Sequence, residues 1–128
     1  MNPSAQRDVQ TKLTKNLLDL IILTILENHP MHGYELMTTV RKSYGVSFGA
    51  STIYPMLSEI EKKHLIKSEW NTNVERPRKT YMLTDEGRRM LDFSANTLKV
   101  ICSSIVSVGK MPGRELPHEI QVIPHYSP

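Results

Sequence analysis

Residues 13–26 of this 128-residue chain carry apolar side chains on nearly every side of the helix that they predict. A helix that is apolar all round is buried, so this segment is expected to form the centre of the core. The predicted helix ends before Pro30, because proline disfavours helical geometry at the residue that precedes it. No apolar stretch reaches the roughly 18 residues of a membrane span, and residues 1–12 lack the apolar run of a secretory signal. We therefore expect a cytoplasmic protein with no membrane partner.

Two further helices are predicted downstream. The first covers about residues 33–45 and repeats apolar side chains at four-residue spacing. The second begins near Ser51 and ends near Lys63, and its inner face consists of Ile53, Leu57 and Ile60. Pro55 does not prevent this helix, because the first four N–H groups of a helix have no partner within it.

The pattern then changes to that of a β-hairpin. Residues 65–70 and 78–83 are typical of strands, and the polar segment 71–77 is typical of the turn between them. Thr84 is a suitable N-cap for a fourth helix, which is expected to continue to about Val108. The predicted fold is mainly α with a small β-hairpin, a winged helix-turn-helix followed by a long helix. Its domains are a DNA-binding domain at 1–83, a dimerisation helix at 84–109 and a proline-rich tail at 110–128.

Three helices followed by a hairpin wing form the winged helix-turn-helix, in which the helix after the turn enters the DNA major groove. The outward positions of that helix are Ser51, Thr52, Tyr54, Ser58 and Lys62. The hairpin turn and the strand after it add three cations suited to phosphate or minor-groove contacts, Arg76, Arg78 and Lys79. The net charge of +3 favours anionic partners without identifying one. Taken singly, a polar helix face or a charged turn is equally typical of a surface that contacts only water.

The C-terminal helix has more apolar surface than a three-helix core can cover. Its apolar side chains recur every three or four residues, and the candidate dimer-interface residues are Leu91, Leu98, Ile101, Cys102, Ile105 and Val108. A second copy of the chain would bury this surface; the alternative is a helix that folds back on its own domain. The single cysteine cannot form an internal disulfide, and we expect it to be a small buried residue, with a redox role left open.

Three segments of the chain form recognisable motifs. Residues 49–57, GASTIYPML, together with Ile60-Glu61 and Leu65-Ile66, resemble the recognition helix of the PadR family of transcriptional regulators. Residues 32–36, HGYEL, are similar to the opening of its second helix, and residues 78–87, RKTYMLTDEG, to its second strand and the helix start that follows. The resemblance covers about residues 13–91. It departs at Ile60, where the family often has leucine, and at His64, where glycine is usual and where we expect the turn to be strained or reshaped.

This resemblance implies a homodimer joined through the C-terminal helix, which binds a palindromic operator in double-stranded DNA and often represses transcription. It also adds Tyr34, from the second motif, to the candidate DNA-contacting residues. In some members of the family a flat aromatic compound between the protomers releases DNA. Here the fourth helix offers only Phe93 as an aromatic wall, so the existence and identity of a small-molecule effector stay open. Trp70, in a predicted strand, is expected to be a packing residue.

An enzyme would require a convergent set of nucleophile, base or metal ligands, and none is apparent in the sequence. His29 and His32 flank Pro30 without further ligands nearby, so we expect no metal, no cofactor and no catalytic residue. The main alternative function is a winged helix that contacts another protein instead of DNA. An acidic or apolar face on the third helix would indicate that alternative, whereas hydroxyls and lysine on this face favour DNA.

Overall fold

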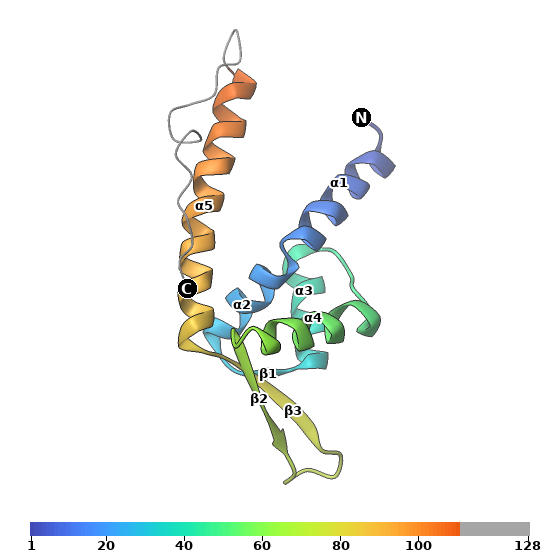
Figure 1. Cartoon of the computed structure of the whole chain (residues 1–128). Helices are drawn as coiled ribbons and strands as arrows, with labels where there is room; N and C mark the ends of the chain where they lie inside the picture. Colours follow the sequence, from blue (N-terminus) through green and yellow to red (C-terminus); the bar gives the residue numbers. More distant parts are fainter. Residues whose placement is uncertain (111–128) are drawn as a thin grey trace. The chain divides into compact units, whose positions relative to one another are not determined.

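The computed structural model describes residues 1–110. In this range the chain forms five helices and a three-stranded antiparallel sheet, and it divides into two compact units, Met1–Arg88 and the part that begins at Arg89. The first unit contains four helices and the sheet (Figure 1). The mainly helical fold with a small hairpin that the sequence predicted is therefore confirmed.

The N-terminal region differs from the single helix that was predicted to begin near residue 13. It contains two helices, α1 at Pro3–Asn16 and α2 at Leu18–Asn28, separated at Leu17, whose backbone leaves helical geometry with φ −102° and ψ 9°. The helix α1 begins with a capped turn, because the Asn2 side chain accepts a hydrogen bond of 2.8 Å from the Ala5 N–H. No residue of α1 is buried, so apolar periodicity could not reveal it.

The core of the first unit forms around α2, as its apolar sequence predicted. Leu18, Ile22 and Leu23 have no exposed surface. They are joined by apolar side chains of the next two helices, α3 at Gly33–Tyr44 and α4 at Ala50–Lys62. Full burial of one such side chain is worth about 1.5–3 kcal/mol, so this cluster supplies much of the driving force for folding.

The sheet consists of β1 at Met31–His32, β2 at Ile66–Asn71 and β3 at Arg78–Leu83, in the order β1-β3-β2. The two longer strands were predicted. The strand β1 was missed, because two residues are too few to show an alternating pattern. It pairs with the middle of β3 and thereby attaches the N-terminus of α3 to the hairpin.

The last described helix, α5, covers Asp85–Lys110. Its predicted cap is confirmed, since the Gly87 N–H donates to Thr84 Oγ1 at 3.0 Å. Cys102, which was expected to be a small buried residue, is exposed in the single chain. None of the helices in residues 1–110 is long and apolar enough to cross a membrane. The predicted proline-rich tail lies outside the described residues, apart from Lys110.

His64 adopts the left-handed backbone conformation, with φ 61°, in the turn between α4 and β2. The sequence predicted that a residue other than glycine would strain or reshape this turn, and His64 holds a positive φ that glycine adopts more readily. The turn persists because the His64 carbonyl accepts a hydrogen bond of 2.6 Å from Thr84 Oγ1, and the next residue, Leu65, is buried in the core.

Replacement of His64 by glycine should raise the free energy of unfolding by about 0.5–1 kcal/mol. The left-handed conformation costs a residue with a Cβ about 1–2 kcal/mol, and glycine avoids this cost. Part of the stabilisation is lost again because glycine has more conformational freedom in the unfolded chain. Urea unfolding of the wild type, His64→Gly and His64→Ala measures the effect. The alanine variant keeps the Cβ and should show no gain; an equal gain in both variants would contradict the backbone explanation.

Candidate nucleic-acid interface

The strands β2 and β3 and the turn between them, residues 72–77, form a hairpin that we call the wing. A groove of about 800 Å³ opens between this wing, α4 and the N-terminus of α3. Six of the nine predicted DNA-contacting residues line this groove: Tyr34, Tyr54, Ser58, Arg76, Arg78 and Lys79. The other three, Ser51, Thr52 and Lys62, lie on α4 outside the groove lining. Sequence reasoning missed four of the lining residues, Gly33, Trp70, Pro77 and Tyr81, and named His32 only as an incomplete metal ligand.

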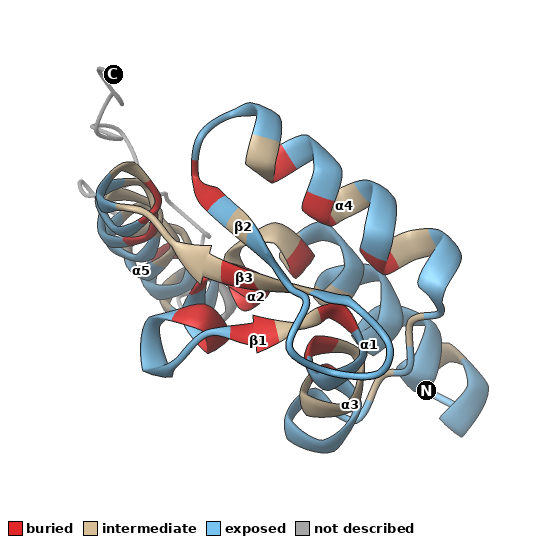
Figure 2. Cartoon of the chain, turned by 90° about the horizontal axis from the view of Figure 1, so that it is seen from below, coloured by how far each residue is buried: buried red, intermediate tan, exposed pale blue. Residues whose placement is uncertain are grey.

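The helix α4 presents one face to the core and another to solvent. Ile53 and Leu57 have no exposed surface, whereas Tyr54 is 43% exposed and Ser58 is exposed. Figure 2 shows this division along α4, and it shows that the wing turn is exposed while parts of the sheet nearer the core are buried. The polar face of α4 and the wing turn are thus both accessible to a large partner.

Tyr54 lies against the start of α3. A Cβ added to Gly33 would stand 2.5 Å from Tyr54 Cε1 and 2.7 Å from the phenol oxygen. Only glycine leaves room for the ring at this place, and the ring is held beside the N-terminal turn of α3. The motif residues Gly33 and Tyr54, which are 21 positions apart in the sequence, therefore form one structural feature.

Tyr81 lies at the base of the groove on the central strand, where it is 6% exposed. Burial raises the pKa of its phenol above the usual value of 10.0, and the charge of Glu61 and the neighbouring Tyr54 raise it further. The phenol is therefore neutral at physiological pH. Beside it in the sheet, Ser68 Oγ donates to Glu61 Oε2 at 2.5 Å and so connects β2 to α4.

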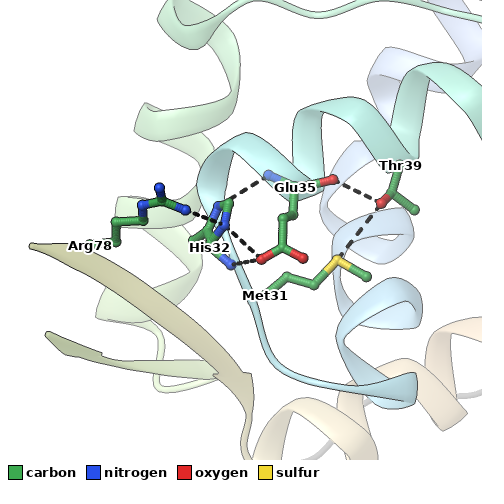
Figure 3. A network of polar contacts seen from close by, with 5 residues as sticks. All are labelled: Met31, His32, Glu35, Thr39 and Arg78. Carbon is green, nitrogen blue, oxygen red and sulfur yellow. Dashed lines mark hydrogen bonds and ion pairs between the residues drawn. The ribbon is translucent and has the colours of Figure 1, made fainter. Parts of the chain in front are cut away.

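The N-terminus of α3 is connected to the wing by a network of polar contacts (Figure 3). His32 is the N-cap: its Nδ1 accepts from the Glu35 N–H, and Glu35 Oε1 accepts from the His32 N–H, both at 3.4 Å. The Nε2 atom of the same ring lies 2.8 Å from Glu35 Oε1 and 3.2 Å from Arg78 Nη1. The predicted DNA-contacting residue Arg78 is thus positioned by α3 as well as by its own strand.

The wing carries an aromatic residue among its cations. Trp70 is 63% exposed, so its expected role as a packing residue is wrong. It lies opposite Lys79 on the neighbouring strand, and the Lys79 Nζ atom lies 5.5 Å from the centroid of the indole ring. The alternation of side chains along β2 places Trp70 on the same side of the sheet as the buried Ile66. The sequence could have shown that Trp70 is exposed only if it had also shown where along β2 the buried core stops.

The candidate dimer residues differ in exposure along α5. Leu91 is 8% exposed, Leu98 and Ile101 are half-buried, and Ile105 is 65% exposed. The side chain of Val108 lies outside the described part of the chain. Among the residues that the structure describes, no three His, Cys, Asp or Glu side chains are close enough together to hold a metal ion.

Comparison with known proteins gives consistent matches. The sequence profile described as "Transcriptional regulator PadR-like family" matches residues 22–92. A PadR family transcriptional regulator from Eggerthella lenta has a similar crystal structure, with a TM-score of 0.77 and 28% identity over 85% of this chain and 96% of that one. A PadR family regulator from Clostridium difficile has a TM-score of 0.66 and 30% identity, covering 71% of this chain and 96% of its own.

A curated relative is much longer. The uncharacterized 37.1 kDa protein in transposon TN4556 of Streptomyces fradiae is 26% identical over 83 residues, which are 65% of this chain. The match spans only 23% of the length of that relative.

A Gly33→Ala substitution should displace the Tyr54 ring without unfolding the protein. The added methyl group meets the far end of a side chain that is 43% exposed, and such a side chain can rotate away. We expect a stability change within about 1 kcal/mol and a shift of the Tyr54 ring signals in the NMR spectrum. In a Tyr54→Ala variant the phenol ring is absent, so Gly33→Ala should not change stability through a clash with it. If Gly33→Ala lowers the free energy of unfolding by several kcal/mol both with and without the Tyr54 ring, another contact excludes the methyl group.

Proposed function

Since this chain belongs to the PadR-like family of transcriptional regulators, we propose that it acts as a homodimeric repressor that binds a palindromic operator through α4 and the wing. The observation that carries the proposal is the groove in which the exposed face of α4 meets the wing cations. The division into a DNA-binding domain at 1–83 and a dimerisation helix at 84–109 is part of the same proposal.

The helix α4 has the surface of a recognition helix. Ser51, Tyr54 and Ser58 are exposed along it, while Ile53 and Leu57 hold it on the core. Short hydroxyl side chains allow close approach to base edges in the major groove, and a tyrosine reaches further. We assign sequence reading to this face, with Tyr54 in the orientation that Gly33 permits.

The wing supplies contacts that do not depend on sequence. Arg76, Arg78 and Lys79 line the same groove as α4, so one DNA duplex could contact both elements. Each cation that neutralises a phosphate releases about one counterion, which makes binding sensitive to salt. The alternative, a module that binds another protein, would be indicated by an acidic or apolar outer face on α4. The hydroxyl groups on this face and the cations of the groove favour DNA instead.

The homodimer is proposed from the exposed apolar part of α5. Ile105 is 65% exposed and Val106 is 55% exposed, with Cys102 exposed nearby in the sequence. Leu91 is already buried within the chain, so the proposed contact surface lies toward the C-terminal half of the helix. A two-fold dimer presents two recognition helices to two half-sites, which is why the operator should be palindromic.

Substitutions in the groove should separate specific from general DNA binding. Tyr54→Ala should weaken binding to DNA from the protein's own promoter region by about 1–3 kcal/mol and leave competitor DNA almost unaffected. Combined Arg76→Gln, Arg78→Gln and Lys79→Gln should weaken binding to all sequences and reduce the salt slope by up to about 3. Fluorescence anisotropy at several salt concentrations measures both effects.

A charge-matched control is Lys12→Gln, Arg41→Gln and Lys42→Gln, because these three cations are exposed and do not line the groove. This control variant should bind DNA like the wild type, apart from a small loss of affinity caused by its lower net charge. Equal losses in the two triple variants would show that net charge matters and the groove does not. Absence of DNA binding at low salt would favour the protein-interaction alternative.

An Ile105→Glu substitution should convert the dimer into a monomer, because a carboxylate cannot be buried unpaired in an apolar interface. Light scattering coupled to size-exclusion chromatography measures the mass. Ser103→Glu is the matched control, since Ser103 is exposed and residues two positions apart point to different sides of a helix. A wild type that is monomeric at micromolar concentration, or dimeric Ile105→Glu protein, would contradict the proposed interface.

A further inference from the structure

Trp70 contributes little to the buried core of the chain. It is the only tryptophan in the sequence, and 63% of its surface is exposed. A large aromatic side chain contributes to stability mainly through the surface that it buries, and Trp70 buries little. It lines the groove that also holds the proposed DNA-contacting residues of α4 and the wing.

The direction of the indole ring follows from strand geometry. Alternate residues of β2 point to the same side of the sheet, so Trp70 shares a side with Ile66 and Ser68. Ile66 is 1% exposed in the core, and Ser68 is half-buried with its hydrogen bond to Glu61 on α4. Trp70 continues this inner side beyond the end of the core. Its ring therefore faces the groove and not the outer surface of the wing.

Lys79 holds the ring in place before any partner binds. The two residues are directly opposite in the antiparallel pair, and the ammonium nitrogen lies 5.5 Å from the ring centroid. Such a cation–π contact reduces the freedom of both side chains, so less conformational entropy is lost when a ligand is bound. The ammonium group has three donor hydrogens, which leaves capacity for an anion.

We propose that Trp70 packs against a deoxyribose of duplex DNA while Lys79 contacts the adjacent phosphate; this inference rests on the DNA-binding function proposed above. The sugar–phosphate backbone alternates an apolar surface with a negative charge, and the Trp70–Lys79 pair offers the complementary apolar surface and positive charge side by side. Backbone contacts carry no sequence information directly. Trp70 therefore contributes to affinity on all sequences, in contrast to Tyr54.

The single tryptophan provides a direct test in the unmodified protein. Selective excitation of Trp70 during titration with promoter DNA should give a saturable change in intensity and emission maximum. Binding of the same DNA is followed independently by the anisotropy of a dye on the DNA, and both titrations should give one dissociation constant. Anisotropy that reports binding while the tryptophan emission stays constant would overturn the proposal.

Variants test whether the contact contributes to affinity. Trp70→Ala should weaken binding about tenfold, by a similar factor on promoter and competitor DNA, and Trp70→Phe should lose less. Tyr44→Ala is the matched control, because Tyr44 is a 43% exposed aromatic residue that does not line the groove. It should bind DNA like the wild type. Thermal unfolding of each variant shows whether the wing is intact.

Three results would overturn the inference. If Trp70→Ala binds DNA like the wild type, the indole ring contributes nothing to the affinity for DNA, even if it lies near the duplex. If Trp70→Ala loses thermal stability and the wild-type emission does not respond to DNA, the residue serves the hairpin alone. If the wild type binds no DNA by anisotropy, the proposed function fails first, and the inference fails with it.

Discussion

The carbonyl group of Leu65 connects the end of α4 to the wing. It accepts a hydrogen bond of 3.1 Å from the backbone N–H of Thr84, and the Thr84 hydroxyl shares its single hydrogen between this carbonyl oxygen at 3.0 Å and that of His64 at 2.6 Å. Leu65 follows the turn at the end of α4, and Thr84 follows the last residue of β3, so both ends of the hairpin are joined at one point. A Cβ on Gly87 would collide with this same carbonyl oxygen, which is why the first turn of α5 requires glycine there. The left-handed turn at His64 is the local cost of bringing these elements together.

The groove depends on this junction. With the base of the wing attached beside the end of α4, the inner side of β2 and β3 faces the exposed side of α4. The hydrogen bond between Ser68 and Glu61 holds the two elements together one step further out. At the N-terminus of α3, His32 places Arg78, and Gly33 leaves the space for Tyr54. Residues from five elements (β1, α3, α4, β2 and β3) and from the turn of the wing therefore reach one surface.

The success of sequence reasoning varied with the strength of the local signal. The buried side of α4 was identified from the helical spacing of Ile53, Leu57 and Ile60. The remaining positions of the helix were therefore assigned to its outer side. Thr84 was recognised as a cap because a hydroxyl before two acidic residues has a local physical meaning. The helix α1 was missed although Asn2 and Pro3 are a typical helix start, because its apolar residues do not form a buried side. Trp70 was expected to pack against other residues and Cys102 to be buried, and both are exposed in the single chain.

The sequence by itself determined the order of α2, α3, α4, β2, β3 and α5, the buried side of α4, and the concentration of cations in the wing. These properties follow from periodicity, capping and charge, which act between residues close together in the chain. Only the tertiary structure decided that Tyr54 lies on Gly33, that Arg78 meets His32, and that the inner side of β2 extends past the core to expose Trp70. Those contacts join residues far apart in the chain, and they depend on where the core ends and how the strands pair, which no local pattern specifies.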